Sequence, residues 1–178
     1  MRTSKRLAIF FILISGLFSF NTFALGAGVQ IGLIPAFDIN QDGIKVNDFE
    51  ANLTGTVKLF RIPAAFGFGM NAGMEDSKFI FGAAGFFDYW VMDLQLKNTW
   101  NLYSGFGLYG KFMFNTDSKA QTSIGPRFFL GCNWLFIDNY LEYYAQITAI
   151  PTYVRNLSDS RGFFRLNLPF ETGLRLHF

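Results

Sequence analysis

The last fifteen residues, "FRLNLPFETGLRLHF" (Phe164 to Phe178), decide the fold class. Their even-numbered positions are apolar except Thr172, whereas their odd-numbered positions are charged, polar, glycine or proline. Alternation with a period of two predicts a β-strand that has one apolar and one polar face. Pro169 cannot donate to a strand ladder, so we expect a bulge or a missing hydrogen bond at that point.

The composition of the whole chain resembles that of a membrane protein. Hydrophobic residues make up 51% of the 178 residues and aromatic residues 19%, whereas only 16% are charged; an ordinary soluble domain has about 25% charged residues. The body of the chain nevertheless contains no run of about 20 apolar residues that could form a membrane-spanning helix. Because only helices and closed barrels satisfy their backbone in lipid, this combination favours a transmembrane β-barrel.

The N-terminus carries the pattern of a signal peptide that directs export through the Sec pathway. Basic Arg2, Lys5 and Arg6 precede an apolar run over residues 7–20, and the small residue Ala24 follows. The alternative is a membrane-anchor helix, which would be short and interrupted. We predict a signal peptide over residues 1–24 and a barrel domain over residues 25–178. Removal of the signal changes the formal charge from +2 to −1, which leaves no basic patch to bind nucleic acid.

Eight amphipathic segments predict an all-β, eight-stranded antiparallel barrel with an up-and-down meander. These segments are residues 27–37, 49–60, 65–74, 79–90, 101–114, 123–135, 140–154 and 164–178. With both termini in the periplasm, the outer loops would be residues 38–48, 75–78, 115–122 and 155–162. The shorter inner turns would lie near residues 61–64, 93–98 and 136–139. Residues 91–100 could extend the fourth strand, begin the fifth or form a long turn.

The C-terminus resembles the signal by which bacterial outer-membrane barrels are recognised for insertion. Glu171, Gly173, Leu176 and Phe178 match its pattern of polar, glycine, apolar and aromatic positions. The resemblance implies that the terminal Phe closes the last strand against the first. It also implies that periplasmic chaperones and the barrel assembly machinery are partners, and that the protein lies in the outer membrane. The alternative is a secreted β-sandwich with a buried C-terminal strand.

A second resemblance covers residues 86–144. The stretches "FFDYW" (86–90), "NLYSGFGLYG" (101–110) and "IGPRFFLGCNWLFIDNYLEYY" (124–144) resemble small spirochaete-type outer-membrane barrels. Together with the C-terminal signal, they suggest a small eight-stranded barrel of the OmpA and OmpX type. Such proteins mostly lack an assigned activity.

The polar faces of the predicted strands place charges of both signs in the lumen. The acids are Glu50, Asp88, Glu142 and Glu171, and the bases are Lys58, Lys111, Arg127, Arg165 and Arg175. Because unpaired ions in a poorly solvated lumen are costly, we expect an ion-pair network. Two pairs are predicted specifically, Glu142 with Arg175 and Arg127 with Glu171. Luminal glycines either make room for these side chains or leave a narrow channel.

Other candidate sites are weaker. "DINQDG" (38–43) resembles the start of a calcium loop, so Asp38, Asn40 and Asp42 form either a weak divalent-cation loop or an ordinary acidic turn. The only histidine, His177, stands far from the outer leaflet, which argues against catalysis, and no catalytic residue, metal site or cofactor is expected. Cys132 is predicted to face lipid. Tyrosines and tryptophans near the periplasmic strand ends are expected to form an interfacial girdle, with a sugar-binding cluster as the alternative: Tyr89, Trp90, Trp100, Tyr103, Trp134, Tyr140, Tyr143 and Tyr144.

We therefore expect a monomeric integral outer-membrane barrel with a plugged, ion-paired lumen and a structural or surface-interaction role without catalysis. Its partners would be outer-membrane lipid and an extracellular ligand bound by the loops. The alternatives are a narrow porin or conduit for small apolar solutes, and, third, a lipid-modifying outer-membrane enzyme.

Overall fold

The computed structural model describes residues 25–40, 43–46, 49–59, 62–75, 78–97, 99–115, 120–157 and 162–178. The predicted signal peptide, residues 1–24, lies outside these ranges. In the described part of the chain, no helix is long and apolar enough to cross a membrane.

Eleven strand segments form one sheet: β1 (Leu25–Ile34), β2 (Ala36–Asn40), β3 (Gly43–Val46), β4 (Glu50–Leu59), β5 (Ala64–Glu75), β6 (Lys78–Lys97), β7 (Trp100–Asn115), β8 (Ala120–Phe136), β9 (Leu141–Asn156), β10 (Gly162–Asn167) and β11 (Phe170–His177). Three pairs of consecutive segments, β1 with β2, β3 with β4 and β10 with β11, each form one interrupted strand of the wall. The wall therefore has the eight antiparallel strands that the sequence predicts, in meander order.

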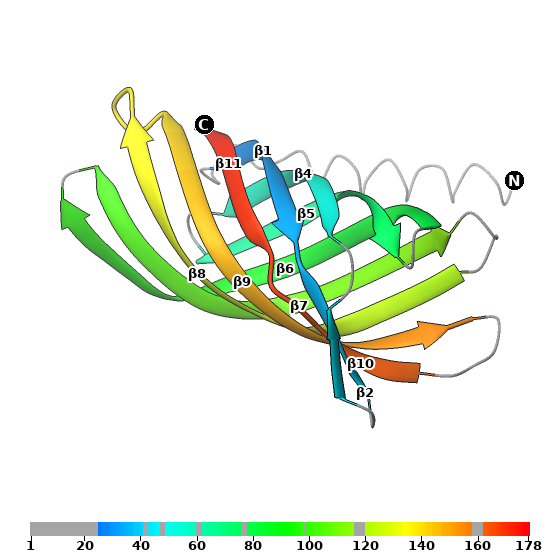
Figure 1. Cartoon of the computed structure of the whole chain (residues 1–178). Helices are drawn as coiled ribbons and strands as arrows, with labels where there is room; N and C mark the ends of the chain where they lie inside the picture. The colour runs from blue at the N-terminus through cyan, green and yellow to red at the C-terminus, as the bar shows by residue number, and fades with distance from the viewer. Residues whose placement is uncertain are drawn as a thin grey trace, which may run out of the picture.

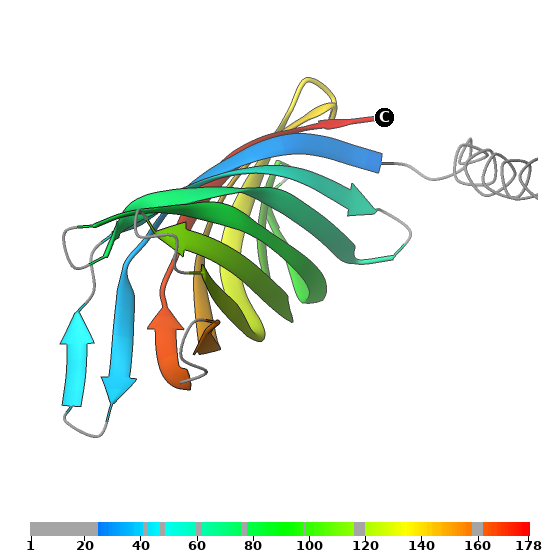
Figure 2. The same ribbon diagram turned by 90° about the vertical axis from the view of Figure 1, so that its right-hand side faces the viewer.

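The barrel closes between its first and last strands. β1 pairs with β11 and β2 pairs with β10, and Figures 1 and 2 show β1 and β11 side by side. The two chain ends of the barrel also meet, because Leu25 N donates to Phe178 O (3.2 Å) and Phe178 N donates to Leu25 O (2.8 Å). This confirms the predicted closed barrel. We call the end that holds Leu25 and Phe178 the terminal end, and the opposite end the loop end.

Two prolines interrupt the hydrogen bonding beside this closure. Pro35 separates β1 from β2, and Pro169 separates β10 from β11. The register of β9 is the same against β10 and β11, so Pro169 causes a missing hydrogen bond and not a bulge. The carbonyl groups of both prolines remain paired, since Leu168 N donates to Pro35 O (3.0 Å) and Thr148 N to Pro169 O (2.9 Å).

Residues 91–97 extend the fourth wall strand. The predicted inner turn over residues 93–98 is therefore wrong, because β6 continues to Lys97 and pairs with β7 as far as Trp100. Two register shifts, one between Trp90 and Met92 and one between Gln95 and Lys97, reverse the alternation of side chains along β6. A strand whose alternation reverses does not show one continuous period, which is why its sequence allowed three interpretations.

The outer wall is apolar, as the alternation predicts. On β9, Tyr143 and Tyr153 are exposed and bracket the outward-facing Ile147. The ten residue steps from Tyr143 to Tyr153 rise about 3.4 Å each, and a strand tilt of about 40° makes this about 26 Å along the barrel axis. The apolar band of such barrels has a height of about 25 Å. The exposed Tyr89, Trp100, Trp134, Tyr140 and Tyr143 are consistent with the predicted girdle.

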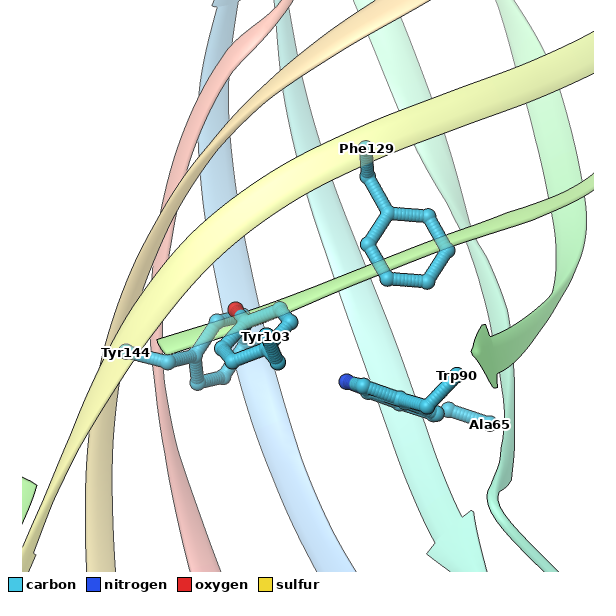
Figure 3. Close-up of a cluster of buried hydrophobic side chains, with 5 residues drawn as sticks. All are labelled: Ala65, Trp90, Tyr103, Phe129 and Tyr144. Atoms are coloured by element: carbon cyan, nitrogen blue, oxygen red, sulfur yellow. The ribbon is translucent and has the colours of Figure 1, made fainter. Parts of the chain in front are cut away.

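Three members of the predicted girdle instead point into the barrel. Trp90, Tyr103 and Tyr144 are buried and form a luminal cluster with Ala65 and Phe129 (Figure 3). Each belongs to the inward face of its strand, which Trp90 shares with Asp88 and Tyr144 with Glu142. Their assignment to the girdle followed residue type, whereas strand parity decides their direction.

Luminal glycines supply the room that these rings occupy. A Cβ atom at Gly131 would lie 2.6 Å from the Tyr103 ring, and one at Gly173 would lie 2.6 Å from the Tyr144 ring. Outward-facing Gly110 differs, because a Cβ atom there would meet nothing within 4 Å. Gly131 and Gly173 therefore accommodate facing side chains, the first of the two interpretations given above.

Candidate functional site

Charged side chains lie along the lumen from the loop end to the terminal end. Their order follows the register of the first wall strand, where Arg165 is opposite Asp38, Glu50 opposite Ile34, Glu171 opposite Gly32 and Arg175 opposite Gly28. We call these charges and their partners the luminal network. Its residues come from β2, β4, β6, β7, β8, β9, β10 and β11, so only the closed barrel brings them together.

At the loop end, Arg165 binds Asp38. Arg165 Nε lies 2.6 Å from Asp38 Oδ1 and Nη2 lies 3.2 Å from Oδ2, which is a bidentate pair. Asp38 is buried and faces the lumen from β2. The sequence predicts Asp38 in an outer loop and in a divalent-cation loop, so the predicted luminal network does not include it. Asp38 lies at an alternate position along the wall strand from the inward-facing Ile34 and Ala36, and this alternation was the signal that could have placed it in the luminal network.

The next pair joins Lys111 of β7 to Glu50 of β4. Lys111 Nζ lies 2.7 Å from Glu50 Oε1 and 2.9 Å from Oε2. Asn71 Nδ2 adds a longer contact of 3.4 Å to Glu50 Oε2. Both charged side chains are buried. Each neutralises the charge of the other, and burying either charge without its partner would cost free energy.

The middle of the lumen is occupied by one cation between two acids. Arg127 has 0% exposure; its Nε lies 3.0 Å from Asp88 Oδ1, and its Nη2 lies 2.5 Å from Glu171 Oε2. Gln146 and Thr148 also donate to Glu171 Oε2, at 2.7 Å and 2.9 Å. These hydrogen bonds satisfy acceptor lone pairs of the buried Glu171 carboxylate. We call Arg127, Asp88 and Glu171 the middle layer.

The Arg127 guanidinium also packs on an aromatic ring. Its central carbon lies 4.3 Å from the centroid of Phe86, an inward-facing residue on the same strand as Asp88. A Cβ atom at Gly67 would lie 2.2 Å from the Phe86 ring, so that glycine makes the stacking arrangement possible. Phe86 is not among the site residues predicted from the sequence.

At the terminal end, one acid receives contacts from three basic side chains. Glu142 has 0% exposure, and its carboxylate lies 3.1 Å from Lys58 Nζ, 3.0 Å from His177 Nε2 and 3.5 Å from Arg175 Nη1. Asn133 Nδ2 donates to the same carboxylate at 2.5 Å. The side chains of Lys58 and His177 retain 13% and 14% exposure because they lie where the barrel opens. We call Glu142, Lys58, Arg175, His177 and Asn133 the Glu142 cluster.

The structure places both specifically predicted ion pairs in contact, Glu142 with Arg175 and Arg127 with Glu171. With Asp38 included, the luminal network within the described part of the chain has five acids and five Lys or Arg residues. His177, which the sequence predicts only to stand far from the outer leaflet, joins the network through Glu142. Its odd-numbered position on the polar face of the last strand was the available signal.

The residues of the predicted assembly signal occupy different environments. Glu171 and Gly173 face the lumen, where Glu171 binds Arg127. Leu176 and Phe178 are exposed on the outer wall beside the closing strand pair. Recognition by assembly proteins remains a prediction.

Among the other candidates, Cys132 lies on the outward side of β8 and is partly exposed. Of the predicted divalent-cation loop, Asp38 is bound by Arg165, Asn40 ends β2, and Asp42 lies outside the described residues. No group of three or more His, Cys, Asp or Glu side chains that could hold a metal ion occurs within the described ranges.

Solved structures show which known fold this architecture matches. Neisserial surface protein A (NspA) overlaps with a TM-score of 0.59 at 14% identity, covering 85% of this chain and 97% of that chain. Ail, the attachment invasion locus protein of Yersinia pestis, gives 0.45 at 11% identity, covering 88% and 99% of the two chains. The N-terminal β-barrel domain of Pseudomonas aeruginosa OprF gives 0.37 at 11% identity, covering 81% and 96%.

The chain has the fold of an outer-membrane β-barrel protein. The fold comparison rests on NspA, whose overlap exceeds 0.5. No protein-family model and no curated protein matches the sequence. The apolar outer wall and charged lumen agree with this fold, because they are the reverse of the arrangement in a soluble barrel.

Proposed function

We propose that this protein is a non-conducting, non-catalytic component of the bacterial outer membrane, with a structural role in the envelope or a role in surface interactions. The observation that carries the proposal is the luminal network. Its ion pairs run from Asp38 and Arg165 at the loop end to Glu142 at the terminal end. An eight-stranded barrel encloses little more than the volume of its own inward side chains.

The middle layer supports a closed lumen most directly. Arg127 binds Asp88 through Nε and Glu171 through Nη1 and Nη2, and it stacks on Phe86. A solute that passes this point must separate Arg127 from its two carboxylates. These ions are held by pairing in place of hydration, so separating them costs several kcal/mol per ion. A pore in this barrel would therefore require rearrangement of the middle layer.

The orientation that we propose places the terminal end in the periplasm and the loop end outside the cell. Three connections lie at the terminal end, residues 60–63, 98–99 and 137–140, whereas the longest connection at the loop end, between β9 and β10, takes residues 157–161. Short periplasmic turns and longer external loops are the usual asymmetry of such barrels. In this orientation the C-terminal strand presents its predicted signal to the assembly machinery, and the loops present their residues to an extracellular ligand.

The position of the only histidine supports the non-catalytic proposal. His177 contacts Glu142 at the terminal end, which faces away from the outer leaflet in the proposed orientation. A lipid-modifying site would need its acid–base group at the opposite end of the barrel.

The test is a conductance measurement on residues 25–178 refolded into a planar lipid bilayer. A heat-dependent shift in gel mobility first establishes that the barrel has folded. We expect no discrete current steps. Reproducible steps from folded protein would contradict the proposal and favour a narrow pore or solute conduit.

A further inference from the structure

β3 forms an edge of the sheet at the loop end of the barrel. The strand order ends at β3, which pairs with β2 and with no other strand in the described part of the chain. On its other side, the ladder between β4 and β5 stops at Glu50 and Gly73, and β5 has turned back into β6 by Lys78. In Figure 2, β3 is the cyan arrow at the outer side of its hairpin with β2. An edge of this kind is a template on which a further strand can add.

The hydrogen bonds of the first wall strand show which of its residues turn towards β3. Leu168 N donates to Pro35 O, which directs the backbone groups of Pro35 towards the last wall strand. Backbone groups alternate in direction along a strand, and the register against β10 stays constant beyond Pro35. The even-numbered Asp38 and Asn40 therefore direct their N–H and C=O groups towards β3.

The same alternation assigns the backbone groups of β3. Lys45 and Gly43 are the register partners of the two even-numbered residues of β2, so their backbone groups point towards β2. Ile44 and Val46 lie between and beyond them, so their N–H and C=O groups point to the free edge. We call Ile44 and Val46 the edge pair.

The side chains of the edge pair add an apolar face to this edge. Ile44 is 73% exposed and Val46 is 64% exposed, and both lie on the outer side of the wall. Ile39 of β2, the register partner of Ile44, is 48% exposed on the same side. A strand added at the edge would cover part of this face.

The stagger of the barrel determines how far the edge lies from the membrane. A row of register partners that starts at Leu25 passes once around the barrel through every wall strand and returns to the first strand at Pro35. Pro35 is nearer the loop end than Leu25. Each step around the barrel in this direction therefore rises towards the loop end.

The edge pair lies beyond the apolar band by this measure. Tyr153 marks the loop-end border of the band, and the row from Tyr153 passes through Phe164 and Ile39 to Ile44. Three steps of about 4.8 Å at a tilt of about 40° rise by about 9 Å. Lipid at the wall does not account for the exposure of Ile44, so its occupant must come from outside the membrane.

A second copy of the chain in the same membrane does not fit this edge. Copies in one membrane are related by rotation about the membrane normal, so their β3 strands would run in the same direction relative to the membrane. Strands that each tilt by about 40° would then cross at about 80° where two barrels face each other. Such a crossing cannot form a ladder, whereas a segment without a membrane-bound orientation can align with β3.

We propose that β3 binds an extended segment of an extracellular protein by strand addition. The segment runs antiparallel to β3, bonds to the backbone of the edge pair and places apolar side chains on the same outer face. Since the edge pair offers only two N–H and two C=O groups, the contact is weak and selects segments with apolar residues at alternate positions. The inference deepens the surface-interaction role and rests on the proposed orientation, in which the loop end faces outwards.

The test uses residues 25–178 refolded into lipid nanodiscs, where lipid covers the apolar wall. The probe is the peptide KTVTVTVTK, and two further forms carry backbone N-methyl groups on the valines or on the threonines. Directly opposed residues of antiparallel strands share a face, so the valines are the residues that bond to the edge pair. We expect N-methylation of the valines to weaken binding by about tenfold or more, and N-methylation of the threonines to change it by less than about twofold.

Amide hydrogen exchange, followed by NMR, reports on the edge directly. In the free barrel the N–H groups of Ile44 and Val46 should exchange faster than that of Lys45, which is directed to β2. Addition of the unmethylated peptide should slow exchange at Ile44 and Val46.

Two variants at one position separate the backbone from the side chain. Ile44→Pro removes an edge donor without removing a bond between β3 and β2, and should weaken peptide binding by about tenfold or more. Ile44→Thr keeps the donor and is the matched control, with an expected loss below about threefold. If Ile44→Pro gives no heat-dependent gel shift, the two methylated peptides decide the question on the unchanged barrel.

Several results would overturn the proposal. They are slow exchange of Ile44 and Val46 in the free barrel, no binding of the unmethylated peptide, equal binding of the two methylated peptides, and equal binding by the folded Ile44→Pro and Ile44→Thr variants. Discrete current steps in the bilayer would contradict the closed lumen and leave these measurements unaffected, so the two proposals fail separately.

Discussion

The middle layer and the Glu142 cluster use opposite charge arrangements within one lumen. In the middle layer a single cation, Arg127, lies between two acids, whereas in the cluster a single acid, Glu142, lies among three basic side chains. Neither group is neutral alone, although the acids and the Lys and Arg residues of the whole network balance. In both groups the pairing is organised around a fully buried central ion, whereas Arg165 with Asp38 and Lys111 with Glu50 form separate pairs nearer the loop end.

The two groups differ in their access to water. Arg127, Asp88 and Glu171 are all buried, whereas Lys58 and His177 at the terminal end keep part of their side chains exposed. Desolvation is therefore more complete in the middle layer. Loss of its central ion should cost more than loss of the central ion of the cluster.

The largest effect is expected from Arg127→Met. This change leaves Asp88 and Glu171 buried without their cation and should lower the free energy of unfolding by about 3 to 5 kcal/mol. Urea titration of the barrel in lipid vesicles, followed by the heat-dependent gel shift, measures the change. Arg155→Met, an exposed position on β9, is the control and should stay within about 0.5 kcal/mol. Equal effects of the two changes would show that the middle layer contributes no stability.

Glu142→Gln should have the second-largest effect, about 2 to 3 kcal/mol, because Lys58 and His177 can recover part of their hydration at the barrel opening. The same urea titration applies. A loss larger than that of Arg127→Met would contradict the ranking by water access.

A double-mutant cycle between Glu142 and Arg175 sharpens the description of the cluster. The contact of 3.5 Å and the direct register pairing of these residues predict a coupling energy of about 1 kcal/mol. The variants are Glu142→Gln, Arg175→Met and their combination. A coupling near zero would mean that Lys58 and His177 hold the carboxylate without Arg175.

Two glycines test whether packing around the middle layer matters as much as its charge. Gly131→Ala places a Cβ atom against the Tyr103 ring, whose hydroxyl donates to Gln146 of the Glu171 site, and should cost about 1 to 3 kcal/mol. Gly110→Ala on the outer wall meets nothing and should be neutral or stabilise by up to about 1 kcal/mol. If both changes destabilised equally, loss of room in the lumen would not explain the effect of the first.

The sequence by itself determined the fold, because alternation along a strand is a local property. Residues 164–178 display the two faces of the last strand without any knowledge of its neighbours, and seven further segments do the same. The same parity identified nine charged members of the luminal network. It failed where the strand is irregular, since the register shifts in β6 depend on pairing with β7.

Only the tertiary structure decided which luminal residues meet. Asp38 and Arg165 are far apart in sequence, and Glu142 collects contacts from β4, β8 and β11, so closure of the sheet creates these groups. The room for the inward rings of Tyr103 and Tyr144 likewise comes from glycines on other strands, Gly131 and Gly173. Alternation specifies which face a side chain occupies, but strand order and register determine the partner that it finds across the lumen.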